Sequence, residues 1–153
     1  MPSQPMESGR QRRLIRVCAL AAVIAGASAP ALAVDLTVKV ANMRSASGEM
    51  HVSVYDNPET FPNKKGMLRE LIVKAEAPVL EVVFPGLPPG TYAVAAFHDE
   101  NGNGEFDQGF LGFPLEDYAF SNDPTVIISA PDFAESAFTV SGAAAEISIR
   151  MTR

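Results

Sequence analysis

The chain has 153 residues with 18 acidic and 12 basic side chains, which gives a formal charge of −6 at pH 7. This length suits one domain behind an export signal, and a single cysteine excludes a fold held together by disulfides. The negative charge disfavours nucleic acid and anionic membranes and favours cations or basic partners, although solubility alone would also explain it.

Residues 1–33 have the three parts of an export signal peptide. A basic segment precedes an apolar stretch at 17–29, which is too short to anchor the chain in a bilayer, and residues 31–33 (Ala-Leu-Ala) form a small-x-small cleavage site. We therefore predict cleavage after Ala33, export to the periplasm or the medium, and one mature domain at 34–153. Removing Glu7 and the four arginines at 10, 12, 13 and 16 from the totals leaves 17 acidic and 8 basic residues in this domain, and no cysteine.

From Val34 onward, apolar residues recur with a period of two, and turn-forming residues interrupt this pattern about every ten residues, which is typical of β-strands. The stretches 35–42 and 49–55 look like a hairpin. The stretch 91–98 is apolar on both faces, which predicts a central strand buried between two layers. The other predicted strands are 69–76, 79–84, 126–129, 138–141 and 145–151. Seven or eight strands in one domain indicate an all-β fold, a single Greek-key, Ig-like β-sandwich.

Three side chains have predicted roles in this scaffold. Phe61, in the long connection at 56–66, is expected to cover one end of the core. Tyr92 follows a Pro-Pro-Gly turn, which is the position of a corner tyrosine whose hydroxyl bonds to the turn backbone. Asp132 is a candidate cap for one helical turn predicted at 131–137.

The acidic loop at 99–110, DENGNGEFDQGF, follows the predicted central strand. Its oxygen-bearing side chains alternate with small residues in the spacing of a calcium loop, with a glycine at position 6 and a backbone carbonyl at position 7. Phe110 replaces the bidentate glutamate of position 12, so the affinity is expected to be weak, about 0.1 to 1 mM. Glu116 is the first candidate to replace that ligand, and Asp117 is the second. The predicted calcium ligands are Asp99, Asn101, Asn103, Glu105, Asp107 and Glu116.

A simpler interpretation of the acidic loop is a pair of ion-free Asn-Gly turns. A hairpin needs only one such turn, however, and without a cation the four carboxylates of the loop would repel one another. Phe106 provides an apolar anchor behind the loop. Glu116 and Asp117 could equally be solvated charges at the rim of the domain.

Three segments carry a resemblance to a known family: HDENGNGEFD at 98–107, FPLEDYAFSN at 113–122 and PDFAESAFTV at 131–140. Together they resemble a family of small exported bacterial proteins known as domain of unknown function 2141. The resemblance implies a β-sandwich of the transthyretin or carboxypeptidase-regulatory kind, and it implies no established activity. The turn GLPPGTY at 86–92 is also similar to turns in calcium-stabilised repeat domains of surface adhesins, which is an analogy of fold alone.

Catalysis has little support in the sequence. The predicted mature chain has two histidines, His51 and His98, but neither a cysteine nor the G-x-S-x-G turn of a nucleophile. It also ends IRMTR, without the Y-R-G-S signature of the transthyretin-like hydrolase of an oxidised purine. His98 adjoins Asp99 and could form a transition-metal site with His51 if their strands pair. The simpler interpretation is a buried histidine that donates a hydrogen bond to a loop oxygen.

The predicted function is a non-catalytic exported module, stabilised by one calcium ion, that binds or positions a protein or glycan of the envelope or extracellular space. The alternative is a metal-dependent small-ligand-binding protein, or an enzyme, that works through His98 and Asp99. Phe113, Tyr118 and Phe120 are expected to be core plugs, although a pocket rimmed by them would suit a carbohydrate or an apolar ligand.

Overall fold

The computed structural model describes residues 33–126 and 129–153. The signal peptide predicted at 1–33 therefore lies outside the described residues, apart from its last residue. The same holds for the centre of the strand predicted at 126–129. No helix in the described part of the chain has both the length and the hydropathy needed to cross a membrane.

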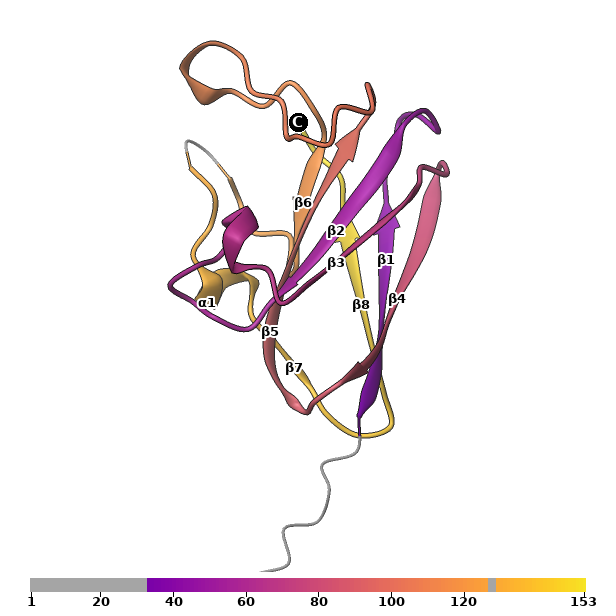
Figure 1. Ribbon diagram of the computed structural model, residues 1–153, viewed down its shortest axis with the longest axis vertical. Helices are drawn as coiled ribbons and strands as arrows, with labels where there is room; N and C mark the ends of the chain where they lie inside the picture. The colour runs from indigo at the N-terminus through magenta and orange to yellow at the C-terminus, as the bar shows by residue number, and fades with distance from the viewer. Residues whose placement is uncertain (1–32, 127–128) are drawn as a thin grey trace, which may run out of the picture.

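Eight strands in the described residues form two sheets that pack face to face (Figure 1). In the first sheet, β1 runs antiparallel to β4 on one side and parallel to β8 on the other. In the second sheet, β5 lies between β2 and β6, β3 pairs with β2, and β7 pairs with the start of β5. The strand bounds are β1 Val34–Ala41, β2 Glu49–Tyr55, β3 Arg69–Lys74, β4 Val79–Leu87, β5 Gly90–Asp99, β6 Tyr118–Phe120, β7 Phe138–Val140 and β8 Ala144–Arg150.

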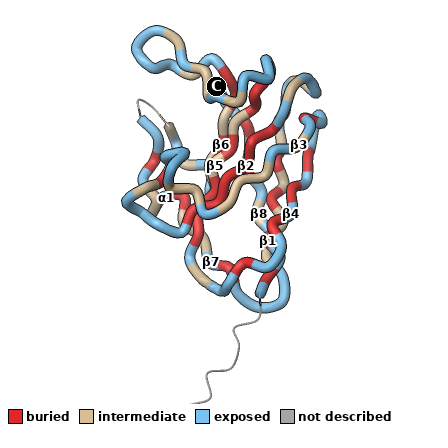
Figure 2. The backbone as a smooth tube through the Cα atoms, viewed as in Figure 1, coloured by how far each residue is buried: buried red, intermediate tan, exposed pale blue. Residues whose placement is uncertain are grey.

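The main core lies between the two sheets and follows the period of two in the sequence. Alternate residues of β1 and β2 are buried against each other across this space, including Leu36, Val38, Met50 and Val52. Figure 2 shows that buried residues concentrate in the strands, whereas most of the exposed residues lie in the connections. Each side chain of this size stabilises the fold by about 1.5 to 3 kcal/mol through burial. The predicted all-β sandwich is thereby confirmed, whereas its assignment to an Ig-like or transthyretin-like class stays a prediction.

The hairpin predicted for the first two strands is wrong. β1 and β2 belong to different sheets, and the chain crosses between them over residues 42–48, beginning at Asn42 with a left-handed φ of 64°. The chain crosses between the two sheets again from β3 to β4. A period of two fixes which face of a strand is buried, but it leaves open whether the next strand lies alongside or across the core.

A second apolar cluster covers the outer face of the second sheet. Phe61 makes edge contacts with Tyr55, Phe120 and Phe133, at centroid distances of 5.1, 5.8 and 5.8 Å. It is buried there rather than over the end of the main core, where it was predicted. Phe133 begins the helical turn α1 (Phe133–Ser136), whose predicted cap Asp132 is confirmed: its backbone N–H donates to the Glu135 carboxylate at 3.0 Å.

Two further contacts tie the sandwich together. The Tyr92 hydroxyl donates to the Pro88 carbonyl at 2.7 Å, as predicted for a corner tyrosine. After β8 leaves the first sheet, Thr152 exchanges two backbone hydrogen bonds with Tyr118 of the second sheet, at 2.8 and 2.9 Å. The end of the chain therefore joins the two sheets.

Candidate metal-binding loop and adjoining groove

The acidic loop starts where β5 ends, and the strand register decides which side chains face it. Glu49 of β2 lies opposite Asp99 of β5, and Met50 lies opposite His98. Because successive residues of a strand point to opposite faces, His98 turns inward with Met50, whereas Asp99 turns to the outer face. His98 is fully buried, and its Nε2 lies 2.6 Å from the Ser47 carbonyl oxygen. This contact agrees with the simpler interpretation of His98, a buried histidine that bonds to a loop oxygen. The side chains of His98 and Asp99 therefore lie on opposite faces of β5.

The Asp99 carboxylate organises the first half of the loop. Its Oδ1 accepts the backbone N–H groups of Gly102 and Asn103 at 2.6 and 3.2 Å, and its Oδ2 accepts that of Gly104 at 2.7 Å. Both glycines have a φ near +74° (73° and 75°), which glycine adopts at little cost. Burial opposes ionisation of Asp99, but the N–H groups of Gly104, Gly102 and Asn103 outweigh it, so its pKa is lowered.

The two asparagines of the loop both turn their amide nitrogens to Asp107. Asn101 donates to this carboxylate at 2.6 Å, and Asn103 donates at 3.1 Å. Their amide oxygens accept the backbone N–H groups of Asn103 and Glu105, at 3.0 and 2.8 Å. Each amide oxygen accepts one N–H and keeps a second lone pair, so Asn101 and Asn103 could ligate a cation as predicted without losing these hydrogen bonds.

Glu116 reaches the loop from the connection that precedes β6. Its side chain is 4 % exposed, and its Oε2 accepts the backbone N–H of Asp107 at 3.1 Å. The other oxygen, Oε1, is buried without a hydrogen-bond partner. Burial raises the pKa of Glu116, and the negative charges of Asp99 and Asp107 raise it further. The carboxylate predicted to complete the ion site is thus brought to the loop, with one oxygen unsatisfied.

The carboxylates of Asp99, Asp107 and Glu116 fit a calcium ion only in part. Among the histidine, cysteine and carboxylate side chains of the described residues, only those of Glu49, His51 and Asp99 bring three ligand atoms within 4.8 Å of one another. Asp99, Asp107 and Glu116 therefore lie further apart and would have to draw together around a cation. Calcium tolerates such adjustment, because its coordination by six to eight oxygens is flexible.

Asp117, the second candidate for the missing ligand, faces away from the loop. Its carboxylate forms ion pairs with Arg44 and with Arg153, the latter at 3.2 Å, and only 2 % of its side chain is exposed. Arg44 makes two hydrogen bonds to it. A carboxylate already satisfied by two guanidinium groups has little capacity left for a metal ion. The prediction of Asp117 as an alternative ligand is therefore wrong.

Asp107 and Glu116 stand at the base of a small projecting hairpin, residues 108–115, which we call the apolar hairpin. Leu115 donates its N–H to the Asp107 carbonyl at 2.9 Å, and Gly109 donates to the Phe113 carbonyl at 2.8 Å. Its tip is strongly exposed, with Phe110 at 85 % and Leu111 at 77 %. Figure 1 shows this segment projecting beyond the sheets before β6. The residues of β6 that follow pair with β5 in the second sheet, whereas the tip of the apolar hairpin does not pack against the sandwich.

A groove of about 650 Å³ lies between the apolar hairpin and the outer face of the second sheet. Its floor includes Phe97, Tyr118 and Phe120, and Phe113 belongs to its lining. Phe106 packs between Phe97 and Tyr118, at centroid distances of 5.7 and 6.0 Å, and so anchors the loop as predicted. These aromatic residues line a groove, and Phe113 is 65 % exposed rather than a core plug.

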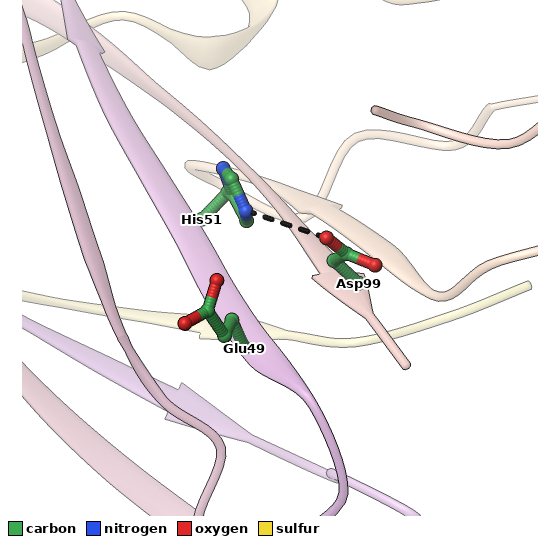
Figure 3. Close-up of side chains that lie close together, drawn as sticks. All are labelled: Glu49, His51 and Asp99. Atoms are coloured by element: carbon green, nitrogen blue, oxygen red, sulfur yellow. Dashed lines mark ion pairs between the residues drawn. The ribbon is translucent and has the colours of Figure 1, made fainter. Parts of the chain in front are cut away.

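One cluster was missed from the sequence, and it is the group drawn in Figure 3. Glu49 and His51 project from one face of β2 toward Asp99 of β5, and the His51 Nε2 lies 3.7 Å from the Asp99 Oδ2. The signal was present in the alternation of Glu49 and His51, but using it requires knowing that β2 pairs with β5. His51 and His98 lie on opposite faces of the sheet, so the predicted alternative of a shared metal site is wrong.

The fold and the loop define a class: a small two-sheet β protein with an acidic loop at the end of its central strand. Residues 38–148 match the family model described as "Uncharacterized protein conserved in bacteria (DUF2141)", and the chain belongs to this family. The resemblance inferred from the sequence is thereby confirmed. No curated protein and no solved structure showed a significant match to the chain.

Proposed function

We propose that the chain is an exported, non-catalytic binding module in which a calcium ion stabilises the acidic loop and the apolar hairpin beside it. Export is supported by the basic, apolar and small-x-small pattern of residues 1–33. The partner is a protein or glycan of the envelope or extracellular space. Its contact surface is the apolar hairpin together with the groove beneath it.

The observation that carries this proposal is the Glu116 carboxylate. It is buried and has one unpartnered oxygen, and two further carboxylates raise its pKa. A buried carboxylate in this state is unfavourable when ionised, because it lacks both water and a counter-charge. A divalent cation shared with Asp107 and Asp99 supplies that charge, and oxygen ligands of this kind suit calcium.

The position of the ion gives it a role in partner binding. Asp107 and Glu116 are the two residues at the base of the apolar hairpin, so an ion held by both fixes the angle at which the tip projects. Lys64 donates to the Gly104 carbonyl at 3.0 Å and ties the loop to the opposite wall of the groove. Exposed Phe and Leu side chains beside an aromatic floor suit an apolar surface or the apolar face of a sugar.

The alternative function, which depends on His98 with Asp99, has no support in the geometry. The two side chains lie on opposite faces of β5, and His98 is fully buried against the Ser47 carbonyl. Neither a substrate nor a shared ligand can reach both groups at once.

Calcium titration of the purified, metal-stripped protein by calorimetry tests the ion. We expect one site with a Kd of about 0.1 to 1 mM, and at least tenfold weaker binding in Glu116→Gln. Glu146→Gln is the matched control, since it removes an exposed carboxylate from the other sheet. No heat at millimolar calcium in the parent protein would contradict the proposal.

Pull-down from envelope extract, with and without calcium, tests the binding surface. The double variant Phe110→Ser/Leu111→Ser should keep the calcium affinity of the parent and lose the calcium-dependent partner. Val83→Ser is the control, because Val83 is an exposed apolar residue on β4 of the first sheet. Equal recovery with all three proteins would place the contact surface elsewhere.

A further inference from the structure

His51 has an environment unusual for a histidine that serves only to fill space. Only 3 % of its side chain is exposed. The ring stacks on that of Phe97, with centroids 4.4 Å apart and planes inclined by 19°. Its Nδ1 lies 3.2 Å from Glu70 Oε1, whereas its Nε2 is buried with no hydrogen-bond partner. The ring is therefore held on two sides with one nitrogen left free.

The contact with Glu70 determines which tautomer the neutral His51 ring adopts. An ionised carboxylate can only accept, so the hydrogen-bond pattern assigns the proton to Nδ1. In the neutral ring, Nε2 then carries a lone pair rather than a proton. This lone pair points toward Asp99, whose nearest oxygen, Oδ2, lies 3.7 Å away, too far for a hydrogen bond.

Two carboxylates face this lone pair. Glu49 and Asp99 are directly opposite each other in the β2–β5 ladder, where like charges are destabilising. The Asp99 Oδ2 accepts one backbone N–H, from Gly104, and so keeps a second lone pair for another partner. Glu49 is exposed and opens the cluster to solvent on one side, which provides an entry path for an ion.

We propose that Glu49, His51 and Asp99 form a binding site for a divalent first-row transition-metal ion of the zinc class. This second ion position shares Asp99 with the proposed calcium site but has its own ligands in Glu49 and His51, where the calcium site has Asp107 and Glu116. One imidazole nitrogen and two carboxylate oxygens are ligands that zinc accepts, and the fourth position is open on the solvent side. Calcium is a poor match, because it prefers oxygen ligands alone.

The geometry needs only a small contraction to hold such an ion. Zinc bonds of about 2.0 to 2.2 Å in a tetrahedral arrangement place ligand atoms about 3.3 Å apart. The His51 and Asp99 atoms are 3.7 Å apart, and all three ligand atoms lie within 4.8 Å of one another (Figure 3). Side-chain rotation of the exposed Glu49 supplies most of the remaining approach.

Glu70 is the outer partner that a metal-binding histidine commonly has. A carboxylate that accepts the second ring N–H orients the imidazole and makes its free nitrogen a better ligand. The stacking on Phe97 fixes the ring plane in addition. Glu70 thus acts as a positioning residue, and its loss should weaken zinc binding without removing a ligand.

Zinc titration of the purified protein by calorimetry, in buffer that already contains saturating calcium, tests the site. We expect one zinc ion per chain in the parent, at least tenfold weaker binding in Glu49→Gln, and no specific binding in His51→Gln. Glu70→Gln should weaken binding by about 10- to 100-fold. The control Glu146→Gln should bind zinc like the parent.

Cobalt substitution gives a second readout that does not depend on heat. Cobalt bound by one nitrogen and two oxygens should give visible absorption bands in the parent, and these should be lost in His51→Gln. Should His51→Gln fail to fold, Glu49→Gln decides the question, because Glu49 is exposed and its substitution spares the core. Unchanged zinc affinity in Glu49→Gln would overturn the site.

The two metal proposals can fail separately. Glu116→Gln should weaken calcium binding at least tenfold and keep the zinc affinity of the parent, whereas Glu49→Gln should weaken zinc binding at least tenfold and keep the calcium affinity. Displacement of zinc by excess calcium would overturn the zinc site as a separate one, because it would mean that a single ion position serves both metals.

Discussion

The two faces of the second sheet follow different rules. Its inner face meets the first sheet through Met50, Val52, Val54 and Val94, all without exposed surface, and forms the main apolar core, with His98 buried at its end. Its outer face gathers His51, Asp99 and Glu116 under the loop, where two buried side-chain atoms lack any partner. Buried polar atoms are nearly always satisfied, so the two unsatisfied atoms beneath the loop are the places on this face where a ligand could complete the structure. The inner face explains the fold, and the outer face indicates the function.

The sharpest way to test this division is a cavity in the core. Phe84→Ala, at a fully buried position of the first sheet, should lower the free energy of unfolding by about 3 to 5 kcal/mol, measured by urea denaturation. Calcium and zinc affinities of the folded variant should stay unchanged. Loss of either metal in this variant would mean that the two faces are coupled.

Calcium should have the next largest effect on the free energy of unfolding, and this effect should depend only on residues of the outer face and its loop. At ten to one hundred times its Kd, calcium would add about 1.4 to 2.7 kcal/mol to the free energy of unfolding. Asp107→Ala should abolish this gain, as should Asp99→Ala, which also removes the acceptor of three backbone N–H groups. Equal calcium-dependent shifts in Tm for Asp107→Ala and the parent would count against the ion.

The pH dependence of the metal-free protein separates the two buried carboxylates. The pKa of Glu116 is raised on folding, so the folded state binds its proton more tightly, and stability should fall as pH rises above the ordinary value of 4.5. Asp99 acts oppositely, because its lowered pKa gives stability that is lost only as pH falls below 3.8. Denaturation curves across this range should lose the first dependence in Glu116→Gln and keep the second.

The smallest expected effect is at the turn that leads into β5. Tyr92→Phe removes the hydroxyl that donates to the Pro88 carbonyl, so it should cost about 0.5 to 1.5 kcal/mol in urea denaturation. Metal binding should be unaffected, since this turn lies at the opposite end of β5 from Asp99. A change in calcium affinity would show that the turn and the loop communicate along the strand.

Local patterns in the sequence predicted the features that depend on local physics. Alternation located every described strand except β6, the Pro-Pro-Gly turn located the Tyr92 contact, and oxygen spacing located the loop. Glu116 was also placed correctly at the loop, because the chain between it and Asp107 is short. These predictions needed no knowledge of which strands are neighbours.

The main errors concern partners that are distant in the sequence. The period of two is the same whether β1 pairs with β2 or faces it across the core. The sequence pattern therefore could not show whether these two strands form a hairpin. Asp117 was misassigned because its arginine partners, Arg44 and Arg153, lie 73 positions earlier and near the chain end. The cluster around His51 depends on the register of β2 against β5, which no local pattern encodes.

The order of synthesis gives the parallel pairing of β1 with β8 a kinetic meaning. Among the described strands β1 is made first, yet one of its two neighbours is β8, the last of them, and the link from Thr152 to Tyr118 comes later still. Contacts of such long sequence separation close slowly, because most of the chain must be ordered before they form. The first sheet is therefore completed only after β8 has been synthesised, because β1 lacks one of its two neighbours until then.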